Sequence, residues 1–319
     1  MKIKQMYQLF SIFSLIAILT VACHSSDLSN SISKNCRMIQ HKAGETCVPF
    51  EPQRVIVLDE PILANAIALG TKPIGATLTS PLFDKNTPPY LVDEVDYTPV
   101  SVGSQSQPNI EKILQLKPDL ILALEFTNPY DTLSQIAPTV IIEWQDAGHW
   151  KAHLLKVAQA LGKTFQAQQL LADYNTHIVD LRNALNQPPE QIEVSLAYIG
   201  GNTPFIRSDV KNSFSGSILE DVGLARPPSQ NIVHPDYQIE ISEEMIPSLD
   251  ADVLFLFAVN DERGKKTWNK LKNHPLWQKL KVVQNNQVYL VDFYNWRSRN
   301  IFAANSVIDD LFRYLVKES

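Results

Sequence analysis

Two hydrophobic patterns alternate along the first half of this chain. Short apolar runs typical of buried strands lie at residues 54–59, 74–76, 100–103, 120–124 and 139–143. Between them, residues 61–70 and 108–117 carry apolar side chains at helical spacing, and Pro61 and Gly70 stand near the two ends of the first segment. Strands that alternate with helices at this spacing predict βαβ units and a mainly parallel sheet.

From His149 to about Leu185 the apolar residues keep helical spacing with no proline. One helix of about 36 residues would be roughly 50 Å long, the diameter of a domain. We therefore expect it to brace two lobes rather than to lie inside one. Gly162 is the weak point of the pattern, and a kink or a break into two helices is the alternative there.

The strand-and-helix alternation restarts after Pro188 and Pro189. Strands are expected at 194–199, 205–207, 253–257 and 287–291, and helices at 217–223, 242–249 and 303–316. The predicted fold class is therefore α/β, with two Rossmann-like lobes of mainly parallel sheet joined by a single long helix. We expect an N-terminal lobe at 36–148, the connecting helix at 149–186 and a C-terminal lobe at 187–319.

The front of the chain has a different character. Lys2 and Lys4 precede an uncharged run at 9–22, which is too short to span a bilayer comfortably and which ends at Cys23. This segment resembles the lipobox of bacterial lipoproteins, although Thr20 departs from the residues that the pattern prefers. We expect a lipoprotein signal at 1–22, acylation of Cys23 and a flexible Ser- and Asn-rich tether at 23–35. An ordinary cleaved signal or an uncleaved anchor is the alternative.

Composition narrows the function further. The net charge is -6, and removal of Lys2 and Lys4 makes it about -8, which argues against nucleic-acid binding. Residues 37–41 and 45–46 read as two short strands around a turn, so Cys36 and Cys47 would lie close together across a hairpin. In an exported protein we expect a disulfide between them, with two unrelated thiols as the alternative.

Several sequence phrases occur together in a characteristic order. The N-terminal half contains PQRVIVL at 52–58, PIG at 73–75, PNIEKI at 108–113 and LKPDLI at 116–121. The C-terminal half contains FSGSIL at 214–219, ISEE at 241–244, PLW at 275–277 and QVY at 287–289. The chain resembles the solute-binding proteins of ABC importers for ferric siderophores and cobalamin over residues 36 to 319. Its front half looks most like the ferric-citrate branch.

That resemblance implies two lobes around a ligand cleft, no enzymatic activity and no cofactor. It implies a ferric siderophore as the ligand, above all ferric citrate or another anionic iron chelate. It also implies an ABC permease with its ATPase as partners, a lipid anchor in the membrane and a place in the periplasm or cell envelope. We expect a monomer.

The candidate ligand residues follow predicted strands, where the loops of parallel sheets meet ligands. Arginine binds outward-facing carboxylates bidentately, and aromatic rings cover the apolar parts of a chelate. The candidates are Arg207, Arg297, Arg299, Trp296, Tyr294, Trp144, Ser80 and Gln105. Each arginine has an alternative role in an ion pair, for example with Asp209 or Asp292, and Trp296 has an alternative place in the core.

Three carboxylates carry a separate hypothesis. In the resembled family, one exposed carboxylate per lobe docks on a basic pocket of the permease. Glu111 matches the first position, and Glu243 or Glu244 matches the second. Solvated carboxylates on helix faces are the alternative.

The sequence also bears on two other classes of function, a metal-ion-binding protein and an enzyme. His149 and His153 have the four-residue spacing of a metal pair, which would suit direct binding of zinc, manganese or iron. No His-rich loop accompanies them, so we expect no metal site; haem or cobalamin binding is a further alternative within the resembled family. The chain contains no Gly-rich phosphate loop and no Gly-x-Ser-x-Gly motif, so we expect no enzyme.

Overall fold

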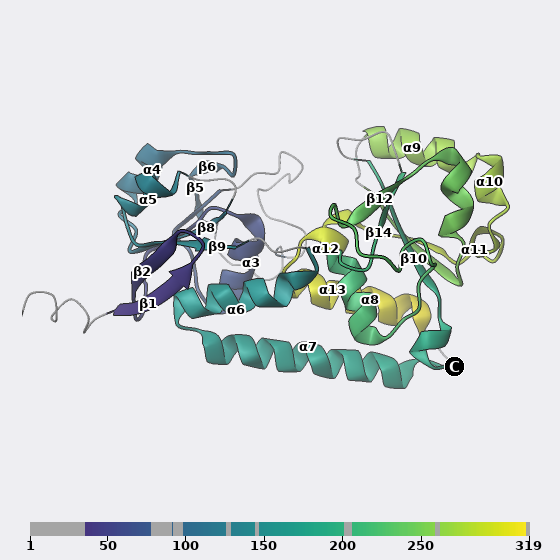
Figure 1. The fold of residues 1–319 in the computed structure, drawn as a ribbon, viewed down its shortest axis with the longest axis horizontal. Coiled ribbons are helices and arrows are strands. Elements are labelled where there is room, and N and C mark those ends of the chain that lie inside the picture. Colours follow the sequence, from purple (N-terminus) through teal and green to yellow (C-terminus); the bar gives the residue numbers. More distant parts are fainter. Residues whose placement is uncertain are drawn as a thin grey trace, which may run out of the picture.

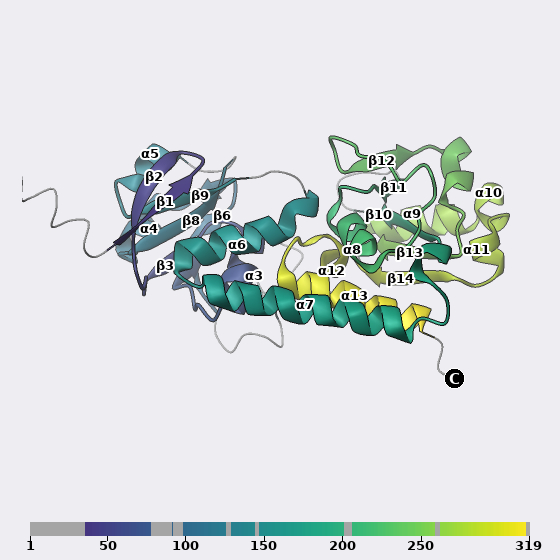
Figure 2. The ribbon, with the colours of Figure 1, turned by 60° about the horizontal axis from the view of Figure 1, so that its bottom comes forward.

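The computed structural model describes residues 36–77, 91, 98–125, 129–143, 147–200, 206–258 and 262–316. Two α/β lobes lie side by side, and helices run beneath both of them (Figures 1 and 2). Within those ranges no helix is both long and apolar enough to cross a membrane. Ser80, Trp144 and Cys23, together with the predicted signal and tether, lie outside the described residues.

The N-terminal lobe opens with the antiparallel hairpin of β1 (Cys36–His41) and β2 (Gly44–Pro49). The Cys36–Cys47 disulfide joins its strands, with Cα atoms 5.5 Å apart, which confirms the predicted pairing. His41 holds the hairpin on the neighbouring sheet, because its Nδ1 accepts the N–H of Ile141 at 3.4 Å.

A five-stranded parallel sheet forms the body of this lobe, in the order β5-β4-β3-β8-β9. The strands are β3 (Val55–Val57), β4 (Gly75–Ala76), β5 (Val100–Ser101), β8 (Leu120–Leu124) and β9 (Thr139–Ile142). Three helices accompany the sheet, α3 (Glu60–Ala68), α4 (Ile110–Gln115) and α5 (Tyr130–Ser134). A pair of short antiparallel strands, each of two residues, precedes α4: β6 (Gly103–Ser104) and β7 (Gln107–Pro108). The predicted βαβ pattern is thus present.

Two helices, rather than one continuous helix, follow the first lobe. A short 3-10 turn at Ala147–His149 leads into α6 (Trp150–Leu161), and α7 (Thr164–Ala184) follows. Gly162 lies between α6 and α7 with φ +73°, a left-handed conformation that favours glycine. The structure therefore does not contain the single long helix that we expected, but the alternative, a break into two helices at Gly162.

Hydrogen bonds fix α6 and α7 against both lobes. Gly148 donates to the carbonyl of Asn212 in the C-terminal lobe at 3.1 Å, whereas Arg37 of the hairpin donates to the carbonyls of Gln159 and Ala160 at the other end of α6. The chain then turns back, and Arg182 near the end of α7 donates to the carbonyl of Val222 at 2.9 Å. Figures 1 and 2 show α7 running along both lobes.

The C-terminal lobe contains a mixed five-stranded sheet in the order β12-β11-β10-β13-β14. Its strands are β10 (Val194–Ile199), β11 (Ile206–Asp209), β12 (Gln238–Ile241), β13 (Val253–Ala258) and β14 (Val288–Asp292). β10, β13 and β14 are parallel, whereas β11 and β12 run antiparallel to their neighbours. Six of the eight strand pairs in the two sheets are parallel, so the predicted α/β class with two mainly parallel sheets is confirmed.

Helices cover both faces of this second sheet. One side holds the 3-10 segment η4 (Glu243–Leu249) with α9 (Glu262–Lys272), α10 (Pro275–Gln278) and α11 (Lys281–Gln284). The other side holds α8 (Phe214–Val222), α12 (Phe293–Arg297) and α13 (Ile301–Leu315).

The start of α13 also contacts the first lobe. The N–H of Ile301 donates to Oδ1 of Asn65 in α3 at 3.3 Å, and both groups are buried. The largest apolar cluster includes Leu63 of α3, Tyr174 of α7 and Val307 of α13. Packing across this cluster therefore holds the lobes together in addition to the chain connection.

Candidate ligand-binding site

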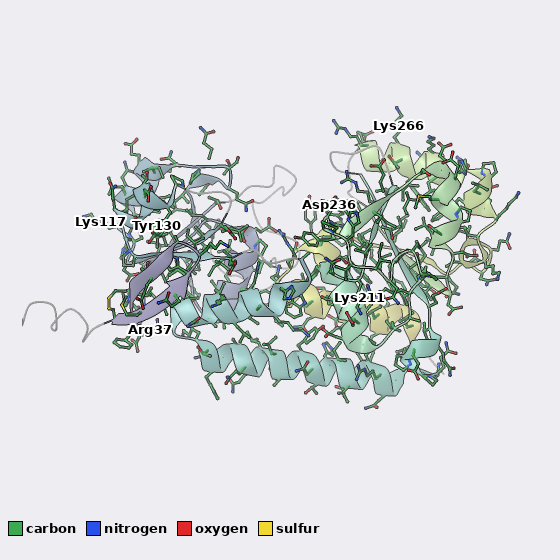
Figure 3. All side chains as sticks on the ribbon, in the orientation of Figure 1. Arg37, Lys117, Tyr130, Lys211, Asp236 and Lys266 are labelled. Atoms are coloured by element: carbon green, nitrogen blue, oxygen red, sulfur yellow. A yellow bond between two sulfur atoms is a disulfide. The ribbon has the colours of Figure 1, made fainter. Side chains whose placement is uncertain are left out.

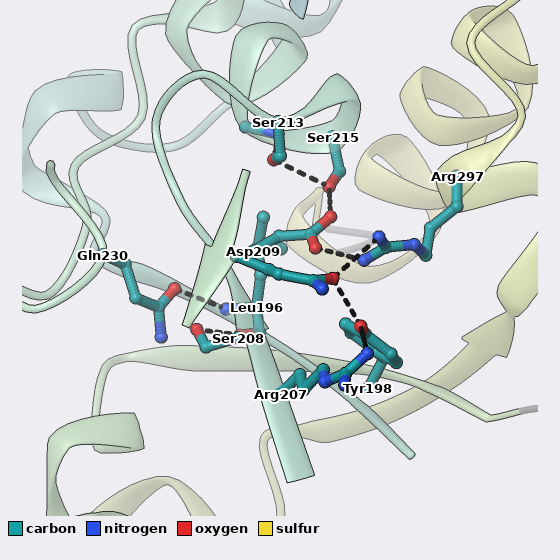
Figure 4. A network of polar contacts seen from close by, with 11 residues as sticks. Leu196, Tyr198, Arg207, Ser208, Asp209, Ser213, Ser215, Gln230 and Arg297 are labelled. Carbon is teal, nitrogen blue, oxygen red and sulfur yellow. Dashed lines mark hydrogen bonds and ion pairs between the residues drawn. The ribbon is translucent and has the colours of Figure 1, made fainter. Parts of the chain in front are cut away.

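A polar network built around Arg297 and Asp209 lies in the C-terminal lobe (Figure 4). Arg297 comes from the end of α12, whose start is capped by Asp292, the acceptor of two backbone N–H groups at 2.8 and 3.0 Å. The Arg297 guanidinium forms an ion pair with Asp209 and donates to Oε1 of Gln238 at 3.1 Å. The predicted ion-pair alternative for Arg297 is therefore present, in a mostly buried form.

Asp209 is held on several sides. Its side chain is 2 % exposed, and it accepts the Ser215 hydroxyl at 2.6 Å in addition to Arg297. Arg226 lies buried beside the same cluster, and burial lowers its pKa to about 10 although the charges of Glu220 and Asp209 oppose the shift. A buried carboxylate with this many partners keeps the Arg297 guanidinium in one orientation.

An aromatic ring completes the support of Arg297. The Tyr198 ring lies under the guanidinium, 4.2 Å from its carbon to the ring centroid. The Tyr198 hydroxyl donates to Gln238 at 2.5 Å and accepts from Nη1 of Arg207 at 3.3 Å. The structure thus brings Arg207 and Arg297 into one network through Tyr198 and Gln238, two residues that the sequence did not single out.

Arg299 approaches from the turn between α12 and α13. Its backbone has φ +52°, an uncommon conformation for a side chain other than glycine. Its positive charge acts on Asp59, the buried N-cap of α3 in the other lobe. Burial raises the pKa of Asp59, whereas the Arg299 charge and the hydrogen bond from the Ile62 N–H oppose that shift.

Gln105 also contacts this carboxylate. Its Nε2 donates to Oδ2 of Asp59 at 2.7 Å, so this amide serves a contact inside the N-terminal lobe. The sequence pattern predicted Gln105 as a ligand residue but gave no indication of this contact with Asp59.

A cavity of about 260 Å³ opens next to these arginines. Arg297 and Arg299 line it together with Ser213, Tyr237 and Phe293. The Arg297 side chain is 25 % exposed, so part of its guanidinium remains accessible although it is paired. The lining combines charged donors with aromatic faces, which suits an anion that carries carboxylates.

Trp296 is not among the residues that line this cavity. It is fully buried, stacks on Phe255 and Phe257, and donates its indole N–H to Asp310 at 2.9 Å. The core alternative thus describes its place. Tyr294 is half-buried in the same short helix, with its ring edge-on to Phe293.

The two histidines of the possible metal pair lie at the start of α6. His149 occupies the N-cap position of α6 without a side-chain capping hydrogen bond, and His153 is buried one turn later. In the part of the chain that the structure describes, no group of three His, Cys, Asp or Glu side chains could hold a metal ion.

The three candidate docking carboxylates differ in their surroundings. Glu111 is exposed in the first turn of α4. Glu243 pairs with Lys270 at 2.6 Å and lies 3.6 Å from His274, which together lower the pKa of its carboxyl. Glu244 accepts the Ser242 hydroxyl at 2.8 Å and has no cationic partner among the described residues.

Comparison with known proteins identifies the family. The model of the "Periplasmic binding protein" family matches residues 56–294, and the chain belongs to that family. It is a family of binding proteins, which confirms that the chain is not an enzyme.

Individual relatives match nearly the whole chain. The "Probable siderophore-binding lipoprotein YfiY" of Bacillus subtilis is 32% identical over 98% of this chain and 99% of its own length. The "Fe(3+)-citrate-binding protein YfmC" of the same organism is 30% identical over 97% of both chains. The structure is similar to that of Staphylococcus aureus SirA complexed with staphyloferrin B, with a TM-score of 0.74, 28% identity and coverage of 88% of this chain and 98% of that one.

Proposed function

We propose that this protein captures a ferric siderophore with outward-facing carboxylates and delivers it to an ABC importer in the cell envelope. Ferric citrate or another citrate-type chelate is the proposed ligand. The single observation that carries this choice is the partly exposed Arg297 guanidinium, which Asp209 and Gln238 hold at the edge of a cavity that Arg299 also lines. The relatives named for siderophores and for ferric citrate support the same ligand class.

In this proposal the arginines bind carboxylates rather than iron. Arg297 and Arg299 donate to the ligand from the cavity, and Arg207 extends the donor set through Tyr198. The phenyl ring of Phe293 and the phenol of Tyr237 cover the apolar parts of the chelate. The iron stays coordinated by the siderophore, so the protein needs no metal ligands of its own.

Isothermal titration calorimetry of the purified protein tests the ligand. We expect saturable binding of ferric dicitrate or a ferric citrate-type siderophore, and no binding of bare zinc. Haem, cobalamin and a ferric hydroxamate serve as competing ligand classes. A strong external chelator should leave the bound complex intact, whereas a directly bound metal ion would be removed. Binding of zinc alone would contradict the proposal.

Arginine variants test the site. Arg297→Gln and Arg299→Gln should each weaken binding about 10- to 100-fold, because charge-assisted hydrogen bonds contribute roughly 1.5–3 kcal/mol. Arg263→Gln removes the same charge from an exposed position on α9 and should leave the affinity unchanged. Equal affinities in all three variants would place the ligand elsewhere.

Delivery to the permease is proposed to use Glu111 and Glu244. Glu244 is the better candidate of the second pair, because Lys270 and His274 already occupy Glu243. We expect Glu111→Gln and Glu244→Gln to reduce iron uptake in cells without changing ligand affinity, and Glu243→Gln to have a smaller effect. Unchanged uptake in the double variant Glu111→Gln/Glu244→Gln would refute this assignment.

The anchor is proposed to be an acylated Cys23. Labelling of cells with a radioactive fatty acid should mark the wild-type protein, and Cys23→Ala should abolish the label. A labelled Cys23→Ala protein would refute acylation at this residue.

A further inference from the structure

The outer side of the C-terminal lobe carries a dense set of positive charges. Residues 262–281, from α9 through α10 to the start of α11, contain seven of the 28 Lys and Arg residues of the chain and only one of its 34 acidic residues. This segment has a net charge of +6, since it has seven cations and one anion, in a chain of net charge -6. We call the seven cations the basic face: Arg263, Lys265, Lys266, Lys270, Lys272, Lys279 and Lys281.

All seven side chains are exposed, and the helices that carry them are fixed by packing. Leu271, Trp277 and Leu280 point inward and belong to the apolar cluster on this side of the sheet. Figure 1 shows α9, α10 and α11 at the outer end of the lobe, and Figure 3 shows Lys266 projecting from α9. The cations therefore form a permanent outward layer.

Few acidic groups neutralise this layer. Glu262 pairs with Lys265 at 3.2 Å, and Glu243 pairs with Lys270 at 2.6 Å and lies near His274. Lys266, Lys272, Lys279 and Lys281 have no ion-pair partner within the ranges that the structure describes. Most of the charge thus remains available to an external anionic surface.

We propose that the basic face binds the anionic phospholipid headgroups of the membrane beside the permease. This inference rests on the proposed function, because it is the delivery step that brings the protein to the membrane. α9 lies on the same side of the molecule as α4, the helix that carries Glu111, and opposite to α7 (Figure 1). A protein that presents its docking carboxylates to the permease would turn α9 toward the adjoining lipid.

The chemistry of the face favours lipid over a protein partner. Six of the seven cations are lysines, which act as point charges and lack the planar fork that binds protein carboxylates bidentately. Protein interfaces need a buried apolar or aromatic centre. None of the exposed large apolar side chains in the described ranges lies between residues 262 and 287. A diffuse cationic surface without an exposed large apolar side chain matches a charged bilayer, which attracts each lysine electrostatically.

Site-resolved footprinting tests the proposal. The full protein, purified from cell membranes, is incorporated into vesicles of phosphatidylcholine alone or of phosphatidylcholine with phosphatidylglycerol. An amine-reactive reagent then modifies the lysines, and mass spectrometry measures each rate. We expect Lys266, Lys272, Lys279 and Lys281 to react about threefold more slowly on the anionic vesicles. Lys117 and Lys211, which lie away from this face, should react equally on both (Figure 3).

Two further arms make the outcome decisive. High salt should restore the reaction rates, because it screens exposed charges. Lys265 and Lys270 of the same face should also react more slowly on the anionic vesicles. The variant Lys266→Gln/Lys272→Gln/Lys279→Gln/Lys281→Gln should abolish this difference in rate. A matched variant, Lys117→Gln/Lys156→Gln/Lys163→Gln/Lys211→Gln, should retain it.

Equal rates on the two kinds of vesicle would overturn the proposal. Protection that appears only when the permease is added to neutral vesicles would overturn it in favour of an acidic protein partner. Calorimetry of siderophore binding on the same preparations reports the ligand function separately, so either hypothesis can fail without the other.

Discussion

The Asp209–Arg297 pair yields the sharpest prediction about the site. Asp209 is almost completely buried, and its partners are the Arg297 guanidinium and the Ser215 hydroxyl. Asp209→Asn keeps the size of the side chain and leaves Arg297 without its counter-charge. Loss of one partner of a buried pair costs about 3–5 kcal/mol. We expect about 3 kcal/mol, the lower end, because Arg297 is 25 % exposed and keeps its contacts with Gln238 and Tyr198.

A double-mutant cycle separates this pair from its surroundings. The free energy of unfolding is measured by urea denaturation for the wild type, Asp209→Asn, Arg297→Gln and the double variant. If the two charges stabilise each other, the double variant should recover about 2 kcal/mol relative to the sum of the single losses. Arg313→Gln, which removes an exposed arginine, should cost less than about 1 kcal/mol. A coupling energy below about 0.5 kcal/mol would refute the view that Asp209 orients Arg297.

Three other predictions follow from the same contacts. Trp296→Phe should lower the free energy of unfolding by about 1–3 kcal/mol, because it leaves Asp310 without its indole donor. Calorimetry should find the siderophore affinity of this variant unchanged, and a loss of affinity would instead indicate that Trp296 contacts the ligand. Asp59→Asn keeps an N-cap of equal quality but removes a carboxyl whose pKa is raised by burial in the folded state. The folded wild type therefore takes up a proton more readily than the unfolded chain, and its stability relative to this variant should rise as the pH falls from 7 through that raised pKa. If urea denaturation shows the same pH dependence for both proteins, the shift is contradicted. Gly162→Ala should destabilise the protein by about 1–2 kcal/mol, because Gly162 has φ +73° and an added Cβ would lie 2.9 Å from the carbonyl oxygen of Phe50. Thermal unfolding measures the effect, and a variant that unfolds at the same temperature as the wild type would show that alanine is not strained in this conformation.

The sequence predicted the elements more completely than their contacts. Hydrophobic periodicity located the strands of both sheets except β12, because burial on both faces leaves continuous apolar runs such as 120–124 and 253–257. The edge strand β12 was missed, since its short run Gln238–Ile241 mixes polar and apolar residues. The break at Gly162 was one of two alternatives, since periodicity continues through a glycine that ends one helix and precedes another. The left-handed backbone there, and the Arg37 contacts at the end of α6, appear only in the folded chain.

Side-chain roles at the site were harder to predict for a physical reason. An arginine or tryptophan after a strand is compatible with a ligand, an ion pair or the core, and the choice depends on residues far away in sequence. Trp296 of α12 is in the core because it packs on Phe255 of β13 and donates a hydrogen bond to Asp310 of α13. Tyr198 and Gln238 carried no signal in the sequence, because an aromatic residue in a strand and an amide at the start of another are ordinary. Only their meeting at Arg297 gives them a role.

The arrangement of charges around the cavity suggests how it would select its ligand. Arg297 faces the buried carboxylate of Asp209, and the charge of Arg299 acts on the buried carboxylate of Asp59 in the other lobe. The cavity is therefore not a region of uncompensated positive charge. Its guanidinium groups act as donors of fixed direction, and an anion gains from them only if its oxygens meet those directions. Such a site favours a rigid chelate, whose carboxylates the metal holds in place, over the same organic acid in its flexible, metal-free form, which would lose conformational entropy on binding.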